Sequence, residues 1–238
     1  MGYQQTSLGL IMTLDEALEQ LRTEIEPGRS EGMRNYHKQT REVMGIPNTA
    51  LNDLTKGWRQ SLTVPERVDL ARELWNTDIF EGRIAAAKLL TQARIKDDDQ
   101  VWVLIQGWVR DFDSWAIADH ACMAGQKRLM ANPTRVSDVE EWTHSTHMWT
   151  RRAALVVTLP WTKQNNPKPT DLEIRDRVLG WCARYADDNE WFIQKAIAWW
   201  LRDLSKHDPA RVIKFLDRHG TQLKPFARKE AAKYLASD

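Results

Sequence analysis

The sequence predicts an all-α fold in which antiparallel helix pairs stack into a superhelical solenoid. Nearly every segment of the 238 residues carries apolar residues at three- and four-residue spacing, as helices with one buried face do. Runs that alternate apolar and polar residues, as strands do, are not found in the sequence. The predicted helix pairs recur every 35 to 50 residues or so, roughly the period of HEAT-like repeats.

Capping boxes predict where several helices begin. In this motif a Ser or Thr and a Glu three residues later satisfy each other's backbone N–H groups in the first turn. Four such pairs occur: Thr13 with Glu16, Thr63 with Glu66, Ser137 with Glu140, and Thr170 with Glu173. Two further helices are expected to begin at Asp208-Pro209 and near Pro225, because proline suits the first helical position.

Helix-breaking Gly and Pro residues, and long runs of helix-forming residues, predict where most of the other helices lie. Gly45-Ile46-Pro47 is expected to end a helix that begins near Glu31, and Asn48 to cap the next one. Acidic residues at 97–99 suit the start of another helix. Runs of good helix formers predict helices over residues 79–95, 113–125, 148–159 and 191–202. About thirteen helices are expected in all, with a loop over residues 160–170.

Length and composition fit one soluble domain. The chain has 42% hydrophobic residues, and no apolar run approaches the roughly 18 residues of a membrane helix. We predict a single HEAT-like repeat domain over residues 13–238, preceded by a flexible leader over residues 1–12. No secretory signal pattern is visible, so a cytoplasmic location is expected. Cys122 and Cys182 are expected to be buried and reduced.

Positive charge is concentrated near the C-terminus. The net charge is +1, but residues 195–238 carry ten Lys or Arg against five acids, which makes this segment +5 and the rest −4. Such a segment fits a surface that contacts phosphate groups. Ordinary solvated helix faces would produce the same distribution, so charge alone leaves both interpretations open.

Three predicted helices each place an indole and a charge on one face. These sets are Trp115 with Asp119, Trp149 with Arg152, and Trp199 with Lys195 and Arg202. One interpretation is a shared aromatic and ionic cleft. The other is that the indoles pack against neighbouring helices and the charges are solvated, because the chain contains 12 Trp and chance pairs are expected.

Four separated motifs resemble those of the AlkD-type DNA alkylation repair family and occur in the same order. They are Met44-Gly45-Ile46-Pro47, Ser114-Trp115 followed by Asp119, Trp149-Thr150-Arg151-Arg152-Ala153-Ala154, and the run from Phe192 to Arg202 followed by Arg228-Lys229-Glu230-Ala231. The similarity extends from about Leu14 to the end of the chain. The chain departs from the family at Ala116, where many relatives carry Asp, at His120 and at Trp200.

The resemblance implies a monofunctional DNA glycosylase that removes cationic N3- and N7-alkylated purines from double-stranded DNA without deep base flipping. Carried over by motif, the catalytic residues would be Trp115, Asp119, Arg152 and Trp199. Contacts to the DNA backbone are expected from Arg202, Lys195, Arg151 and Lys206. The enzyme would act as a monomer with no metal or cofactor and no membrane association.

The chemistry of this reaction suits a carboxylate beside indole rings. A purine alkylated at N3 or N7 leaves as a neutral base, so the positive charge that develops on the deoxyribose is what needs stabilising. A carboxylate near C1′ does this and can orient or deprotonate the attacking water, a role we expect of Asp119, with Arg152 favouring its ionised form. Indole faces attract cations by about 0.5 to 2 kcal/mol each, so Trp115 and Trp199 would hold the cationic nucleotide.

Two other functions fit the same sequence. A HEAT-like module could bind DNA structures without excising bases, or could bind an acidic protein through its basic face, because the solenoid fold does not itself confer catalysis. His144 and His147 have a spacing that can bind metal on a helix, but no Cys or acid motif completes a site, so they are expected to be polar surface residues.

Overall fold

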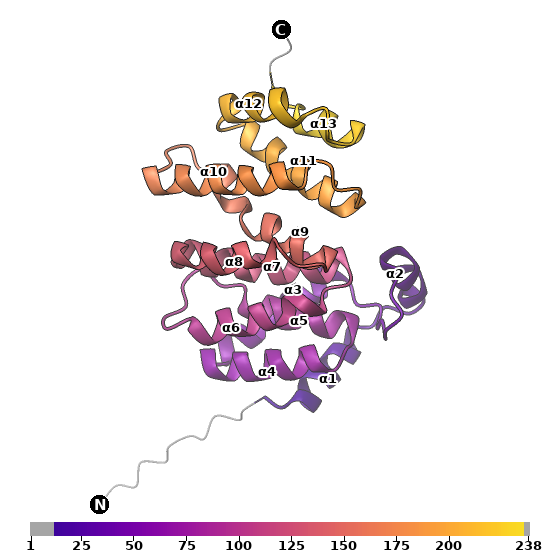
Figure 1. Cartoon of the computed structure of the whole chain (residues 1–238). Helices are drawn as coiled ribbons and strands as arrows, with labels where there is room; N and C mark the ends of the chain where they lie inside the picture. The colour runs from indigo at the N-terminus through magenta and orange to yellow at the C-terminus, as the bar shows by residue number, and fades with distance from the viewer. Residues whose placement is uncertain (1–11, 236–238) are drawn as a thin grey trace, which may run out of the picture. The chain divides into compact units, whose positions relative to one another are not determined.

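The computed structural model describes residues 12–235 and shows helices throughout (Figure 1). This part of the chain forms thirteen α-helices and three short 3-10 helices and contains no strand, which confirms the all-α prediction. The chain divides into two compact units, one ending at Ile95 and the other beginning at Lys96. The single domain expected over residues 13–238 stays a prediction. Residues 1–11 of the expected leader lie outside the described residues.

The first unit is built around a central helix. Its helices are α1 (Leu14–Thr23), α2 (Arg29–His37), α3 (Asn48–Ser61), α4 (Val64–Asn76) and α5 (Phe80–Leu90). Helix α5 packs against both α3 and α4, and ten of its eleven residues are buried, as expected for a helix covered on all sides. Only residues 77–79 join α4 to α5, so the two pack as an antiparallel pair.

The second unit is a stack of helix pairs. Its α-helices are α6 (Asp99–Trp108), α7 (Trp115–Ala131), α8 (Val136–Trp142), α9 (Met148–Val157), α10 (Pro169–Arg184), α11 (Trp191–Ser205), α12 (Pro209–His219) and α13 (Pro225–Ala231). The odd-numbered helices pack in succession, α7 on α9, α9 on α11 and α11 on α13, while α10 packs on α12. Alternate helices therefore form separate layers, as in HEAT-like repeats.

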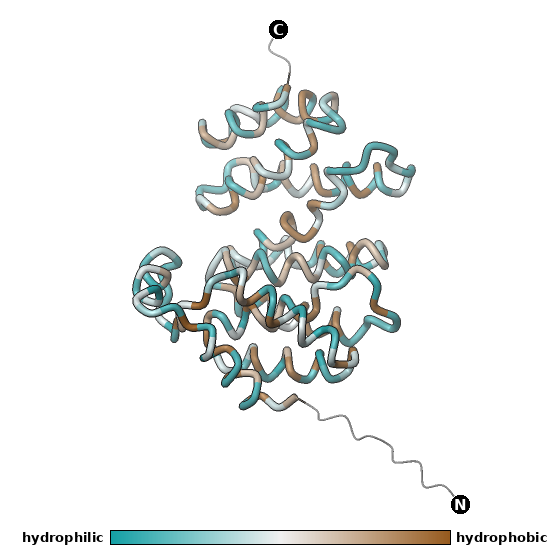
Figure 2. Tube along the Cα trace, turned by 180° about the vertical axis from the view of Figure 1, so that it is seen from behind, coloured by the Kyte–Doolittle hydropathy of each residue, from teal (hydrophilic) through white to brown (hydrophobic). Residues whose placement is uncertain are grey.

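Some helices of this stack bury one side only, whereas in α9 all six residues from Arg152 to Val157 are buried. Figure 2 shows hydrophobic and hydrophilic residues alternating along the helical turns. In α12, for example, Val212 and Phe215 are buried, whereas Lys214 and Arg218 are exposed. Stability thus comes mainly from apolar faces pressed against neighbouring helices.

Two of the four predicted capping boxes are confirmed, those at Thr13 and Thr63. The box predicted at Ser137 is wrong, because a 3-10 turn over Pro133–Arg135 starts the segment and α8 already begins at Val136. The box predicted at Thr170 is also wrong. Pro169 occupies the first helical position there, and Asp171 supplies the acid that bonds the N-cap backbone.

Several predicted helix ends lie elsewhere. Helix α2 ends at His37 rather than at Met44, because Lys38 adopts a left-handed conformation with φ of 51°. Helix α5 ends at Leu90 rather than Ile95, and α7 continues to Ala131. Part of the expected loop over residues 160–170 is a 3-10 helix, Leu159–Lys163.

A buried carboxylate holds the turn at Gly45. The side chain of Glu81 on α5 is fully buried and accepts hydrogen bonds from the backbone N–H groups of Met44 (2.8 Å), Gly45 (2.7 Å) and Ile46 (3.2 Å). Gly45 has a φ of 88°, and a Cβ there would lie 2.7 Å from the backbone nitrogen of Ser30. The turn therefore needs both Gly45 and the Glu81 side chain that accepts from its backbone N–H groups.

We predict that Glu81→Gln lowers the free energy of unfolding by about 1 to 3 kcal/mol, because the amide replaces one of the two oxygens that accept from three buried N–H groups with an NH2 donor. Urea denaturation followed by Trp fluorescence measures this change. Glu42→Gln is the matched control, since Glu42 is exposed in the same loop and its replacement should change the free energy by no more than about 0.5 kcal/mol. Equal effects of the two substitutions would contradict the anchoring role of Glu81.

Candidate functional site

A bidentate ion pair joins α7 to α9. The two terminal nitrogens of Arg152 donate to the two carboxylate oxygens of Asp119, Nη1 to Oδ1 at 2.5 Å and Nη2 to Oδ2 at 3.3 Å. The Arg152 side chain is 6% exposed and that of Asp119 is 23% exposed. A buried cation thus fixes the direction of a carboxylate that still reaches solvent.

Aromatic contacts link this pair to a third helix. The guanidinium carbon of Arg152 lies 5.6 Å from the ring centroid of Trp149. Trp149 in turn packs against Phe192 of α11, with ring centroids 4.7 Å apart. The Nε of Arg152 is buried and has no hydrogen-bond partner among the described residues. The guanidinium is therefore held by its two terminal nitrogens, which bond Asp119, and by the ring of Trp149.

A free cysteine lies close to the ion pair. Cys122 is fully buried on α7, as predicted for both cysteines. Burial raises the pKa of its thiol above the ordinary value, and the negative charge of Asp119 acts in the same direction. The thiol therefore stays protonated and serves as a small packing residue rather than as a nucleophile.

On α11, Trp199 is bonded to an acid that sequence reasoning missed. Its indole Nε1 donates to Oδ2 of Asp203 at 3.1 Å, one helical turn further on. Asp203 is 10% exposed and also pairs with Arg202 at 3.2 Å and with Lys163 at 3.8 Å. The spacing of four residues between Trp199 and Asp203 was the available signal. This bond fixes the edge of a half-buried indole.

Trp115 begins α7 and is half-buried, and Asp119 follows one turn later on the same side of the helix. The four predicted catalytic residues lie on α7, α9 and α11, and α9 packs against each of the other two helices. Asp119 and Arg152 are in direct contact. Trp199 makes its hydrogen bond to Asp203 instead.

Two of the four predicted DNA-binding residues are exposed. Lys195 and Lys206 both lie at the surface. The Nζ of Lys195 is 5.8 Å from the ring centroid of Trp191, and that of Lys206 is 4.3 Å from the ring centroid of Tyr234. Their ammonium groups are supported by aromatic rings and remain available to a phosphate.

The other two, Arg151 and Arg202, are engaged within the protein. Arg151 donates to the carbonyls of Ser145 and Thr146 and pairs with Asp188 at 3.0 Å. Arg202 pairs with Glu230 at 2.5 Å in addition to Asp203, and its hydrogen bond holds the pKa of Glu230 below the ordinary value. Both arginines therefore hold loops and helices together, and their contact with DNA stays a prediction.

Within residues 12–235, no group of three or more His, Cys, Asp or Glu is placed to hold a metal ion. His147 lies just before α9, with Nδ1 2.9 Å from the hydroxyl of Thr150. In the same part of the chain, no helix is both long and apolar enough to cross a membrane.

Comparison with known proteins agrees with this architecture. A family model described as DNA alkylation repair enzyme matches residues 17–235. The fold is similar to that of a predicted DNA alkylation repair enzyme from Enterococcus faecalis, with a TM-score of 0.75 and 22% identity over 90% of this chain and 98% of that one. It is also similar to AlkD2 from Streptococcus mutans, with a TM-score of 0.64 and 18% identity over 94% of this chain and 100% of that one.

No curated protein matches the chain significantly. At these identities the two solved structures establish the fold alone. The family model, however, matches all but the two ends of the chain. The chain belongs to the DNA alkylation repair enzyme family.

Proposed function

We propose that this protein is a monofunctional DNA glycosylase that hydrolyses the N-glycosidic bond of cationic N3- and N7-alkylated purines, such as 3-methyladenine and 7-methylguanine, in duplex DNA. The observation that supports it best is the Asp119–Arg152 pair, which presents a carboxylate of fixed direction at the surface of α7. Membership of a repair enzyme family supports the same conclusion.

The reaction follows from the charge of the substrate. When the bond from C1′ to the base breaks, the cationic purine keeps the electron pair and leaves neutral, and the sugar takes up positive charge. Asp119 stabilises that charge by Coulomb attraction. Water then forms the new bond at C1′ and releases a proton to solvent. Retaining glycosidases use two close carboxylates, whereas this set contains one, so direct attack by water is the simpler route.

The bidentate pairing limits what Asp119 does. Both of its oxygens accept hydrogen bonds from Arg152, so an attacking water would have to compete with the guanidinium for either oxygen. Its role is therefore electrostatic and orienting rather than that of a strong general base. Arg152 acts through Asp119, as a positioning residue.

The indoles complete the site in this proposal. Trp115 and Trp199 are half-buried on the helices that flank α9, and their faces would hold the cationic nucleotide and its sugar. A lesion held by its own charge and by its sugar needs no deep base pocket. We further propose that the protein acts as a monomer in the cytoplasm, without metal or cofactor.

We predict that Asp119→Asn lowers the rate of 7-methylguanine release from methylated duplex DNA by about 10² or more, because it removes the charge that faces the sugar cation. Single-turnover release of free base, with 3-methyladenine scored in parallel, measures the effect. Asp217→Asn is the matched control, since Asp217 is an exposed acid on α12. Full activity of Asp119→Asn would rule out a catalytic carboxylate there. Release of no base by the wild-type protein would favour the alternative of a non-catalytic module that binds DNA structures or a protein partner.

A second prediction separates phosphate contacts from structural cations. Lys195→Gln should weaken binding to duplex DNA and reduce the slope of log affinity against log salt by about 0.9, because one cation–phosphate contact is lost. Arg151→Gln should leave that slope unchanged and lower the melting temperature, because it breaks the contacts to Ser145, Thr146 and Asp188. Fluorescence anisotropy at several salt concentrations and thermal unfolding test both variants. An unchanged slope in Lys195→Gln would remove Lys195 from the DNA interface.

A further inference from the structure

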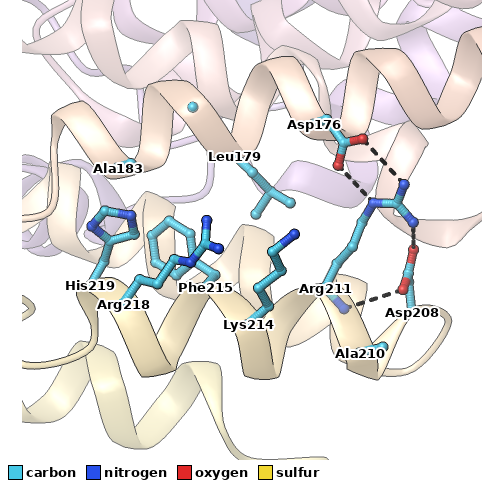
Figure 3. Close-up of a pocket in the computed structure, with 11 residues that line it drawn as sticks. Asp176, Leu179, Ala183, Asp208, Ala210, Arg211, Lys214, Phe215, Arg218 and His219 are labelled. Atoms are coloured by element: carbon cyan, nitrogen blue, oxygen red, sulfur yellow. Dashed lines mark hydrogen bonds and ion pairs between the residues drawn. The ribbon is translucent and has the colours of Figure 1, made fainter.

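A groove of about 570 Å³ runs between α10 and α12 (Figure 3). Its walls are formed by Leu179, Gly180 and Ala183 of α10 and by Lys214, Arg218 and His219 of α12. None of these residues belongs to the proposed catalytic set. The groove lies between two even-numbered helices, whereas the catalytic set lies on the odd-numbered layer of α7, α9 and α11.

The two ends of the groove differ in charge. At one end Arg211 is neutralised by Asp176, at 2.7 and 3.2 Å, and by Asp208, at 2.8 Å (Figure 3). Toward the other end Lys214 and Arg218 extend from α12 toward α10. Both are exposed. Asp176 and Asp208 are the acids among the lining residues of the groove, and both pair with Arg211. This end therefore carries an excess of positive charge, although Asp176 still attracts Lys214 across the groove.

The same end has an apolar floor. Phe215 is 5% exposed and packs against the ring of His219, with centroids 5.1 Å apart. Leu179 of α10 faces it across the groove. At Gly180 an added Cβ would meet nothing within 4 Å, so the wall is open there. The groove thus combines an apolar depression with two cations at its rim.

We propose that this end of the groove binds a short acidic peptide segment of a partner protein. One aromatic or aliphatic side chain of the segment would lie against Leu179 and Phe215, with its carboxylates beside Lys214 and Arg218. An anchor in an apolar depression with charged groups at the rim is the usual anatomy of a protein interface. Complementary charge would speed association and select acidic partners.

Duplex DNA fits this groove less well. DNA contacts are made mainly to phosphates from polar and cationic groups, which make no use of an apolar floor. The inference also stands apart from the proposed glycosylase activity, because peptide binding requires no residue of the catalytic set. Such a segment would attach this protein to a partner while leaving the proposed lesion site unoccupied.

The test uses the full chain and a fluorescein-labelled peptide in which Asp residues flank a single Phe. Fluorescence anisotropy should show saturable binding that weakens with salt. The double variant Lys214→Glu, Arg218→Glu should weaken binding by about tenfold or more, because two attractive contacts become repulsive. Gly180→Leu should do the same by filling the groove without strain, since leucine is a good helix former.

Three controls keep the test specific. Lys56→Glu makes one such charge reversal at an exposed position of α3 and should leave binding unchanged. Peptides with Asn in place of Asp, or Ser in place of Phe, should bind more weakly. Circular dichroism checks the fold of each variant, and Arg218→Gln provides a milder substitution.

The proposal is overturned if the acidic peptide does not bind, or if its affinity is the same in the groove variants. It is also overturned if the groove variants lose affinity for an undamaged duplex oligonucleotide and not for the peptide, which would identify a nucleic-acid surface. Because the readout is binding to a peptide, failure of the glycosylase proposal would leave this result unaffected.

Discussion

The ion pair between Asp119 and Arg152 is the interaction on which the proposed site depends. Arg152 is nearly sealed from solvent, and a buried guanidinium without a counter-charge is strongly unfavourable. Asp119 supplies that charge and at the same time ties α7 to α9. The carboxylate that would face the substrate is therefore held by the same contact that stabilises the helix pair, so its direction is set before any DNA binds.

A second network of charges holds the side chain of Trp199 in place on α11. Asp203 accepts from the indole of Trp199 and pairs with Arg202, which reaches Glu230 on α13. Trp149, which lies beside Arg152, packs against Phe192 and so joins α9 to α11, the helix that carries the second network. Side chains from three helices are thus positioned by contacts within the protein, the preorganisation that electrostatic catalysis requires. Contacts within the protein also engage Arg151, through Ser145, Thr146 and Asp188, and Arg202, through Asp203 and Glu230. Lys195 and Lys206 are the exposed cations of the predicted DNA-binding set.

Local rules predicted the features that depend on neighbouring residues. The helices, the caps at Thr13 and Thr63 and the prolines that begin α12 and α13 all follow from short-range propensity. The box predicted at Ser137 did not form because α8 already begins at Val136, and Glu140 is therefore free to bond Arg177 and the indole of Trp181, which is 41 residues away in sequence. The spacing of Trp115 and Asp119 suggested a site, and the equal spacing of Trp199 and Asp203 allowed their hydrogen bond, but side-chain rotamers decide whether such a bond forms.

The α10–α12 groove could not be predicted from the sequence either, because it depends on contacts between residues that are far apart in the chain. It exists because Gly180 and Ala183 leave space where two helices pack, and a charge count along the sequence cannot separate the neutralised Arg211 from Arg218. Pairing between distant helices decides which charges are available to a ligand. Sequence periodicity shows only that they are near a surface.

The central claim is that Asp119 stabilises positive charge on the sugar. The most direct measurement compares the affinity of the protein for two duplexes, one with a cationic pyrrolidine abasic analogue and one with a neutral tetrahydrofuran at the same position. Transition-state mimics bind more tightly than neutral ground-state analogues when the protein favours the developing charge. The account predicts that the wild-type protein prefers the cationic duplex and that Asp119→Asn loses this preference. Equal affinity of the wild-type protein for the two duplexes would contradict it.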